Sequence, residues 1–138
     1  MSYTTLNEAK RGGKTVSYPI CSKFCSIGVV TSYTWNQTFL AVSDGFVRLY
    51  DSEETYNTDF KNFVQEIYIT DDIKTSQIKS KNISKVQGIE WIIHAFYIEI
   101  ENGFWMPQRL IKVGSFDIGV VQALKASIDR LRTSDTVS

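Results

Sequence analysis

Hydrophobic and polar residues alternate over short segments of this chain, which is the pattern of β-strands rather than of helices. Trp35–Val42 and Phe46–Tyr50 are two such segments, and Asp44-Gly45 lies between them. Both positions of a two-residue hairpin loop need a positive φ, which Gly adopts freely and Asp tolerates. The sequence therefore predicts a β-hairpin over residues 35–50.

Further strands are predicted on both sides of this hairpin. They are Lys23–Thr31, Phe63–Thr70, Thr75–Ile83, Trp91–Ile100 and Trp105–Val113. The long apolar run at 91–100 predicts a well-buried strand. Pro107 lacks a backbone donor, so the strand that contains it is expected at an edge or only after the proline.

The last segment changes to a helical period. Val121, Leu124, Ile128 and Leu131 recur on one face of a predicted helix over Asp117–Arg132, with Ser115 or Asp117 as its N-cap. A helix this short is not stable alone in water, so its apolar face is expected to cover the strands.

The chain is expected to be one mainly β domain. Its 138 residues suffice for a core, and its aromatic and β-branched residues favour strands. We assign residues 1–20 to a flexible N-terminal tail, 21–132 to the domain and 133–138 to a C-terminal tail. Cys21 and Cys25 are expected to be free thiols in a reducing compartment, and no membrane-spanning run or signal peptide is recognisable. A cytoplasmic protein is therefore expected.

The net charge is zero, which argues against nucleic acid as a partner. The distribution is uneven, because residues 1–23 are basic, residues 44–60 are acidic, and residues 73–89 carry four lysines and no acid. For any single cluster, an ordinary solvated loop is the favoured interpretation.

No catalytic constellation is recognisable, so the chain is not expected to be an enzyme or to need a cofactor. Gly13-Lys14-Thr15 resembles the end of a phosphate-binding loop, but Glu8 stands where the earlier glycine should be. His94 is the only histidine and lies in an apolar run, which favours a structural role. With Cys21 and Cys25 it matches no metal-site spacing, so no metal is expected.

Several landmarks together resemble the pleckstrin homology (PH) family. They are Gly28-Val29-Val30, Trp35, Phe39-Leu40-Ala41-Val42, Asp44-Gly45, Leu49-Tyr50-Asp51, Phe96-Tyr97-Ile98, Ile111 and the terminal helix, in which Leu124 replaces the tryptophan typical of the family. The resemblance implies a seven-stranded, partly open barrel of two antiparallel sheets, capped by a C-terminal α-helix.

A closer resemblance is to the acylated PH-domain proteins of apicomplexan parasites. It rests on the Asn, Lys, Ile and Tyr bias and on Tyr18-Pro-Ile-Cys21. It implies a lipid-anchored sensor of phosphatidic acid on secretory organelles. The anchor of these proteins needs an N-terminal glycine with a nearby cysteine, whereas the sequence here begins Met1-Ser2-Tyr3.

The resemblance also locates a candidate ligand site. Phosphoinositide-binding members carry Lys or Arg at the end of the first strand and along the second, where this chain has Ser32, Asn36 and Thr38. A simpler anionic lipid is therefore expected. Its headgroup would be bound by Lys23, Arg48, Lys61 and Arg109, helped by a basic arm of Lys10, Arg11 and Lys14. For Arg48 and Arg109, an ion pair with a nearby acid is an equal alternative.

Aromatic residues in the loops are candidates for membrane contact. Tyr33 and Trp105 are predicted to lie at the bilayer interface, where amphipathic rings are favoured. The alternative for Phe104-Trp105-Met106 is packing beneath the terminal helix.

Two functions follow from these expectations. The first is a monomeric, non-catalytic module that is recruited to membranes by phosphatidic acid. The second is a protein-interaction module that recognises a peptide at a sheet edge or beside the terminal helix.

Overall fold

The computed structural model describes residues 15–26, 29–30, 35–86, 88–101 and 108–137. Its strands are β1 (Val16–Ser26), β2 (Val29–Val30), β3 (Asn36–Ser43), β4 (Phe46–Tyr50), β5 (Gln65–Tyr68), β6 (Ile73–Thr75), β7 (Lys79–Val86), β8 (Ile89–Ile100) and β9 (Gln108–Ser115). Its helices are α2 (Glu53–Thr58) and α3 (Ile118–Val137). The described chain is therefore mostly β, as predicted.

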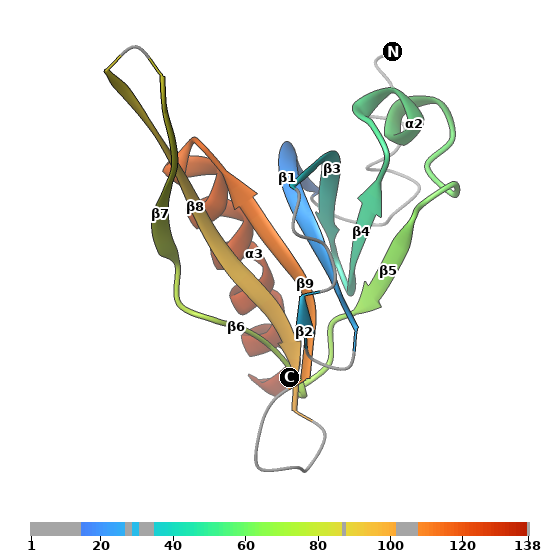
Figure 1. Cartoon of the computed structure of the whole chain (residues 1–138). Helices are drawn as coiled ribbons and strands as arrows, with labels where there is room; N and C mark the ends of the chain where they lie inside the picture. Colours follow the sequence, from blue (N-terminus) through green and yellow to red (C-terminus); the bar gives the residue numbers. More distant parts are fainter. Residues whose placement is uncertain (1–14, 27–28, 31–34, 87, 102–107, 138) are drawn as a thin grey trace.

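The strands form a curled, antiparallel half-barrel (Figure 1). The strand order is β5-β4-β3-β1-β9-β8-β6, with β2 paired to β1 and β7 paired to β8. β1 pairs with β3 through residues 16–22 and with β9 through residues 21–24. The two halves of the predicted barrel are therefore continuous through β1, and α3 closes one side in the manner of a PH-like fold.

The predicted hairpin is confirmed. Ser43 pairs with Phe46, which leaves Asp44 and Gly45 as the two-residue loop, and Gly45 has φ +97°. Val42 and Val47 lie opposite each other and are both buried. The loop chemistry and the core-facing pattern thus specify the same register.

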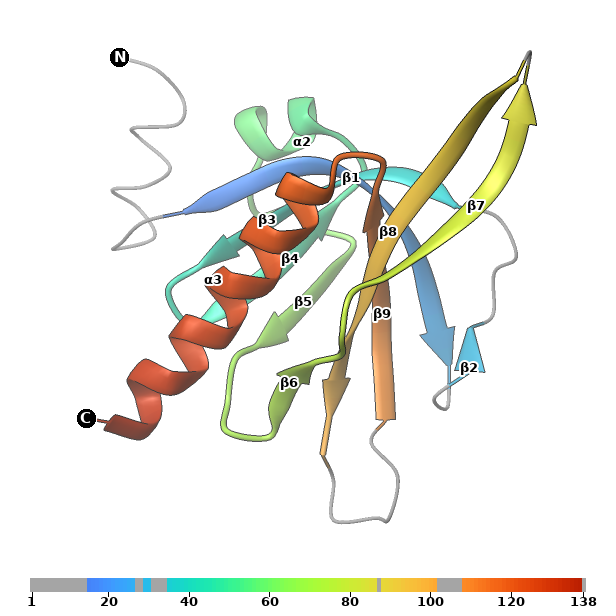
Figure 2. The same ribbon diagram turned by 90° about the vertical axis from the view of Figure 1, so that its left-hand side faces the viewer.

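The main core lies between the sheet and α3 (Figure 2). Val121, Leu124 and Ile128 of the helix are completely buried among residues of β3, β4, β8 and β9. The Asp117 side chain accepts a hydrogen bond from the Gly119 N–H, which caps the helix start as expected. The helix continues to Val137, beyond its predicted end at Arg132.

β1 begins at Val16 rather than at Lys23, inside the segment assigned to a tail. The strand was predicted only where the chain turns apolar, at Lys23, whereas its paired part begins seven residues earlier. Pro19 lies within this part and cannot donate a ladder hydrogen bond. Among the described strands only β3 pairs with β1 at Pro19, so β1 has one open edge there, where proline is tolerated.

The prediction that 91–100 is buried throughout is wrong for its first part. Ile89, Trp91 and Ile92 are exposed, whereas burial begins at Ile93. The reason is that β7 and the start of β8 form a hairpin that projects beyond the rest of the sheet (Figures 1 and 2). Apolar composition indicates a strand here but not what covers it.

α2 was not predicted, because its six residues are too few for a periodic signal. The Ser52 side chain accepts a hydrogen bond from the Thr55 N–H and caps the helix. Tyr56 is buried against Phe39 and Tyr50, with ring centroids 5.0 and 5.2 Å away. α2 therefore covers a second, aromatic core on the far half of the sheet.

Candidate functional site: a cationic pocket

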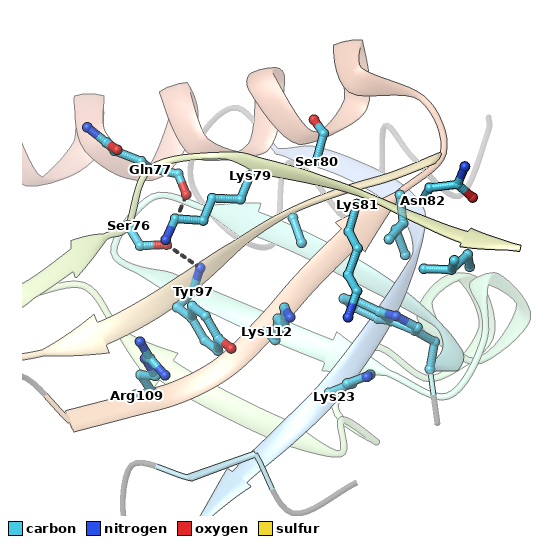
Figure 3. A pocket seen from close by; sticks show the side chains of 14 residues that line it. Lys23, Ser76, Gln77, Lys79, Ser80, Lys81, Asn82, Tyr97, Arg109 and Lys112 are labelled. Atoms are coloured by element: carbon cyan, nitrogen blue, oxygen red, sulfur yellow. Dashed lines mark hydrogen bonds between the residues drawn. The ribbon is translucent and has the colours of Figure 1, made fainter. Parts of the chain in front are cut away.

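A hollow of about 710 Å³ lies on the face of β7, β8 and β9 and is bounded by the end of β1 (Figure 3). We call it the cationic pocket, and its charged and aromatic residues are Lys23, Trp35, Lys79, Lys81, Tyr97, Arg109 and Lys112. This volume is within the range of small-molecule sites, about 300–1,000 Å³. Among its described lining residues there is no Asp or Glu.

Strand register gathers these side chains from distant parts of the sequence. Lys23 of β1 lies opposite Lys112 of β9, and Lys112 lies opposite Tyr97 of β8. On the other side of β8, Lys79 and Lys81 of β7 lie opposite Ala95 and Ile93. Lys23, Lys81 and Lys112 point toward one another across the hollow (Figure 3).

Two aromatic rings form the floor of the pocket, and the cationic groups of three side chains lie over them. Lys23 Nζ and Lys112 Nζ lie 4.9 and 5.4 Å from the centre of the Trp35 ring. Arg109 stacks on Tyr97, with its Cζ 4.2 Å from the ring centre. Such cation–π contacts position a cation while leaving its outer face open to an anion.

The indole of Trp35 fits because residue 114 is glycine. A Cβ atom at Gly114 would lie 2.8 Å from a Trp35 ring carbon and 3.1 Å from Ile93 Cδ1. Real Cβ contacts are not this short, so any other residue would push the ring out. Gly114 therefore sets the depth of the pocket floor.

The pocket is electrostatically unbalanced. Burial lowers the pKa of Lys23, and the charges of Lys112 and Lys81 lower it further. No ion pair joins Lys23, Lys79 or Lys81 to a carboxylate among the described residues, while Arg109 has a long contact of 3.9 Å with Glu99. An anion placed here would relieve the repulsion.

No protein-family model matches the chain, and no curated protein matches it. The structural likeness to the PH-like fold rests on strand order and on the terminal helix alone. What the pocket binds must therefore be argued from its own residues.

Of the four cations predicted to bind a headgroup, the structure brings together Lys23 and Arg109. Arg48 lies on β4, where its Nε donates to Glu66 at 2.6 Å and its guanidinium lies over Phe46 and Phe63. Burial opposes its charge, but the Glu66 carboxylate raises the pKa of Arg48 above its usual value. The ion-pair alternative is thus the observed state of Arg48.

The remaining predicted residues do not join the pocket. Lys61 is exposed in the segment after α2. Asn36 is exposed at the start of β3, and Thr38 shares a hydrogen bond of 2.9 Å with the Ser22 hydroxyl. Tyr33, Trp105, Ser32 and the arm residues Lys10, Arg11 and Lys14 lie outside the described residues, so their roles stay predictions.

Lys79, Lys81 and Lys112 were not predicted as site residues. The acid-free cluster at 73–89 was the available signal for the first two, and their spacing places both on one face of a strand. No local sequence feature indicates that Lys112 is a site residue, because its place in the pocket depends on the pairing of β9 with β1, which puts it opposite Lys23.

Other candidate chemistry in the described residues is sparse. The Nδ1 of His94 and the Ser80 hydroxyl share a hydrogen bond of 2.6 Å on β8 and β7. Cys21 is a half-buried free thiol, and burial raises its pKa. No cluster of three or more His, Cys, Asp or Glu side chains suited to a metal occurs in the described part of the chain. No helix in that part has the length and apolarity needed to cross a bilayer.

Proposed function

We propose that this chain is a non-catalytic, PH-like membrane-recruitment module that binds an anionic phospholipid headgroup in the cationic pocket. One observation carries the proposal: four lysines and an arginine surround one hollow whose described lining contains no carboxylate. A soluble domain has no structural reason to gather like charges at this density, since each repels its neighbours. An anionic ligand would supply a counter-charge for Lys23, Lys79 and Lys81.

A phosphomonoester is the ligand chemistry that fits best. It carries between one and two negative charges near neutral pH, with a second pKa of about 6. The side chains of Lys23, Lys81 and Lys112 point toward one another across the pocket (Figure 3), and their ammonium groups are donors for the oxygens of the phosphomonoester. Phosphatidic acid presents such a group on a membrane, as the resemblance to the apicomplexan proteins also implies.

A polyphosphoinositide fits less well. Its ring phosphates would need charges along the first part of β3, where Asn36 is uncharged and Thr38 is bonded to Ser22. The cations lie instead on β7, β9 and the end of β1. The proposal therefore names phosphatidic acid as the preferred lipid.

Vesicle sedimentation tests this proposal. The protein should bind phosphatidylcholine vesicles that contain phosphatidic acid, and should not bind vesicles of phosphatidylcholine alone. Each basic residue near an anionic surface contributes about 1 kcal/mol. Lys112→Glu reverses one charge and should therefore weaken binding by at least about tenfold.

Lys61→Glu is the matched control, because it makes the same charge change at an exposed position outside the pocket. It should leave binding within about twofold of the wild type. Equal losses in Lys112→Glu and Lys61→Glu would contradict a specific pocket, and equal sedimentation with neutral vesicles would contradict anionic-lipid binding. Stronger binding to vesicles with phosphatidylinositol bisphosphate would overturn the lipid named here.

A protein-interaction module is the second candidate, and the edge of β5 favours it. β5 ends the strand order of the described sheet and exposes Tyr68 and Val64 beside its open edge. An extended peptide could add there as a further strand. A binding partner whose affinity is lost in Tyr68→Asp and retained in Lys112→Glu would support this role.

A further inference from the structure

The β7–β8 hairpin carries exposed apolar side chains immediately beside the cationic pocket. We call them the apolar tip: Ile83, Ile89, Trp91 and Ile92, together with Phe116, which follows β9. Trp91 and Phe116 contact each other edge to face, with ring centroids 5.6 Å apart. Ile89 is 62% exposed and Trp91 is 45% exposed. Nothing in the described core uses these side chains.

Two residues of the tip, Ile89 and Trp91, share one face of β8 with the pocket, whereas Ile92 alternates to the other face. Ile93, Ala95 and Tyr97 line the pocket, and strand alternation places Trp91 and Ile89 on the same face. Lys81 lies opposite Ile93, two residues from Trp91. At about 3.4 Å per residue, this charged level is about 7 Å behind the tryptophan.

This spacing matches the layers of a membrane surface. The headgroup region of a bilayer is about 5–8 Å deep on each side of the hydrocarbon. Tryptophan favours the boundary between the two layers. If Trp91 lies at that boundary, Lys81 lies among the headgroup phosphates, and the rest of the pocket follows toward water.

Charge also argues for a lipid surface over a second copy of this chain. A two-fold contact through the tip would bring two cationic pockets close together without carboxylates in their described linings. The acid on the hairpin, Glu90, lies opposite Lys85 in the register and alternates to the other face of β8 from Trp91. An anionic bilayer complements both the apolar tip and the cations behind it.

We propose that the apolar tip inserts into the boundary of an anionic bilayer while the cationic pocket binds a phosphate at the headgroup level. This inference rests on the proposed function and deepens it, since it names the membrane-contacting element and the orientation of the module. It also favours phosphatidic acid over a polyphosphoinositide, because the monoester phosphate of phosphatidic acid is the one on the glycerol, close to the hydrocarbon, whereas the monoester phosphates of a polyphosphoinositide lie on the inositol ring, farther toward water. The β7–β8 hairpin thus acts as the insertion device.

Two readouts separate insertion from headgroup binding. The first is sedimentation with vesicles of phosphatidylcholine and phosphatidic acid. The second is an NMR titration with soluble glycerol 3-phosphate, which reports on the pocket without a bilayer. Trp91→Asp and Ile89→Glu each place a charge on the tip. Tyr68→Asp is the matched control, because it removes an aromatic ring that is even more exposed from β5, at the far end of the sheet.

Trp91→Asp and Ile89→Glu should each weaken vesicle binding by at least about tenfold, because each removes an apolar side chain that the bilayer would bury on binding. Their affinity for glycerol 3-phosphate should stay within about twofold of the wild type, and Tyr68→Asp should change neither readout. If Trp91→Asp perturbs the fold, as judged by circular dichroism, Ile89→Glu alone decides, because its side chain has the most exposed position on the tip.

Wild-type vesicle affinity in Ile89→Glu would overturn the insertion. So would a wild-type protein that binds no vesicles, or one that dimerises through the tip and keeps its vesicle affinity in Ile89→Glu. Tip-dependent vesicle binding without any response to glycerol 3-phosphate would overturn the headgroup pocket and leave the insertion standing. The two failures are therefore distinguishable.

Discussion

At the scale of single residues, the pocket depends on a glycine, Gly114, because any side chain at this position would collide with its floor. Gly114 lets the Trp35 indole approach β9 closely, and the indole in turn lies beneath the ammonium groups of Lys23 and Lys112. A residue without a side chain thus helps to set the positions of two charges.

Gly114→Ala should destabilise the fold by about 1–3 kcal/mol, because its Cβ overlaps the Trp35 ring and a packed core tolerates added volume poorly. Urea unfolding measures the change. Trp35→Leu should cost less in the Gly114→Ala background than in the wild type, since a smaller side chain relieves the overlap. Strictly additive effects would contradict a direct contact between residues 35 and 114.

The pKa of Lys23 offers a test of the pocket's electrostatics. Burial is the main cause of its depression and Lys112 the next, so Lys112→Met should raise this pKa part of the way toward 10.5. Glycerol 3-phosphate should raise it as well, because a bound anion favours the charged form. NMR titration of the Lys23 side chain measures both shifts. A pKa that is unchanged in Lys112→Met would contradict the coupling.

The lowered pKa of Lys23 also determines how its contribution to the free energy of unfolding changes with pH. The pKa of Lys23 is lower in the folded state than in the unfolded state, so the unfolded chain binds more protons between the two values. The contribution of Lys23 to the free energy of unfolding therefore rises with pH through that window, up to about pH 10.5.

Sequence reasoning reached part of the pocket. Lys23 and Arg109 are two of the four cations predicted to bind a headgroup, and both line the hollow. Arg48 and Lys61 were predicted with them, yet neither joins them. Cations on strands are easy to list, but which of them converge depends on non-local register, as for Lys23 and Lys112. Local sequence does not encode that register.

At the scale of elements, α3 stabilises the half-barrel through one narrow stripe. Leu124, at the centre of this stripe, is completely buried. Beside this stripe, the Thr75 hydroxyl of β6 donates a hydrogen bond of 2.7 Å to the Asp129 carboxylate. Asp129 lies in the second half of α3, so this bond fixes that part of the helix to the sheet. Packing supplies stability, and the polar contact fixes position.

Leu124→Ala should lower the free energy of unfolding by about 2–5 kcal/mol, because it leaves a cavity between helix and sheet. Gln122→Ala, on the exposed face of the same helix, is the control and should change it by less than about 0.5 kcal/mol. Chemical denaturation followed by circular dichroism measures both. A small effect of Leu124→Ala would mean that the helix is not part of the cooperative fold.

Elements were predicted unevenly, for physical reasons. The β3–β4 hairpin was found because Asp44-Gly45 and the alternation on each side agree. α2 was missed because its stability comes from the Ser52 cap and from Tyr56 packing rather than from a repeated apolar face. The exposure of Trp91 was missed because an apolar run has the same composition on a projecting hairpin as in a core.

At the scale of the whole molecule, a net charge of zero conceals a separation of charge. The acidic residues Asp51, Glu53 and Glu54 lie at or beside α2, whereas the cations gather at the β7–β8 side (Figures 1 and 3). An anionic surface would therefore attract one side of the protein and repel the other. The separated charges would therefore orient the protein at an anionic surface although its net charge is zero.

Hydrogen exchange on vesicles that contain phosphatidic acid should report this orientation. Amides of β7 and of the start of β8 should exchange more slowly than in free protein, while those of α2 and β5 should exchange at unchanged rates. Phosphatidylcholine vesicles provide the control and should protect neither region. Protection confined to α2 or β5 would contradict the proposed orientation.

The pairing of β1 with β9 has a consequence for how the pocket forms during folding. Lys79, Lys81 and Tyr97 lie on a local hairpin, whereas Lys23 and Lys112 come together only when β9 pairs with β1. A chain that has not yet paired these two strands can display the apolar tip, but it lacks the assembled set of cations. If the pocket binds a headgroup as proposed, selective binding to a membrane requires the pairing of β1 with β9.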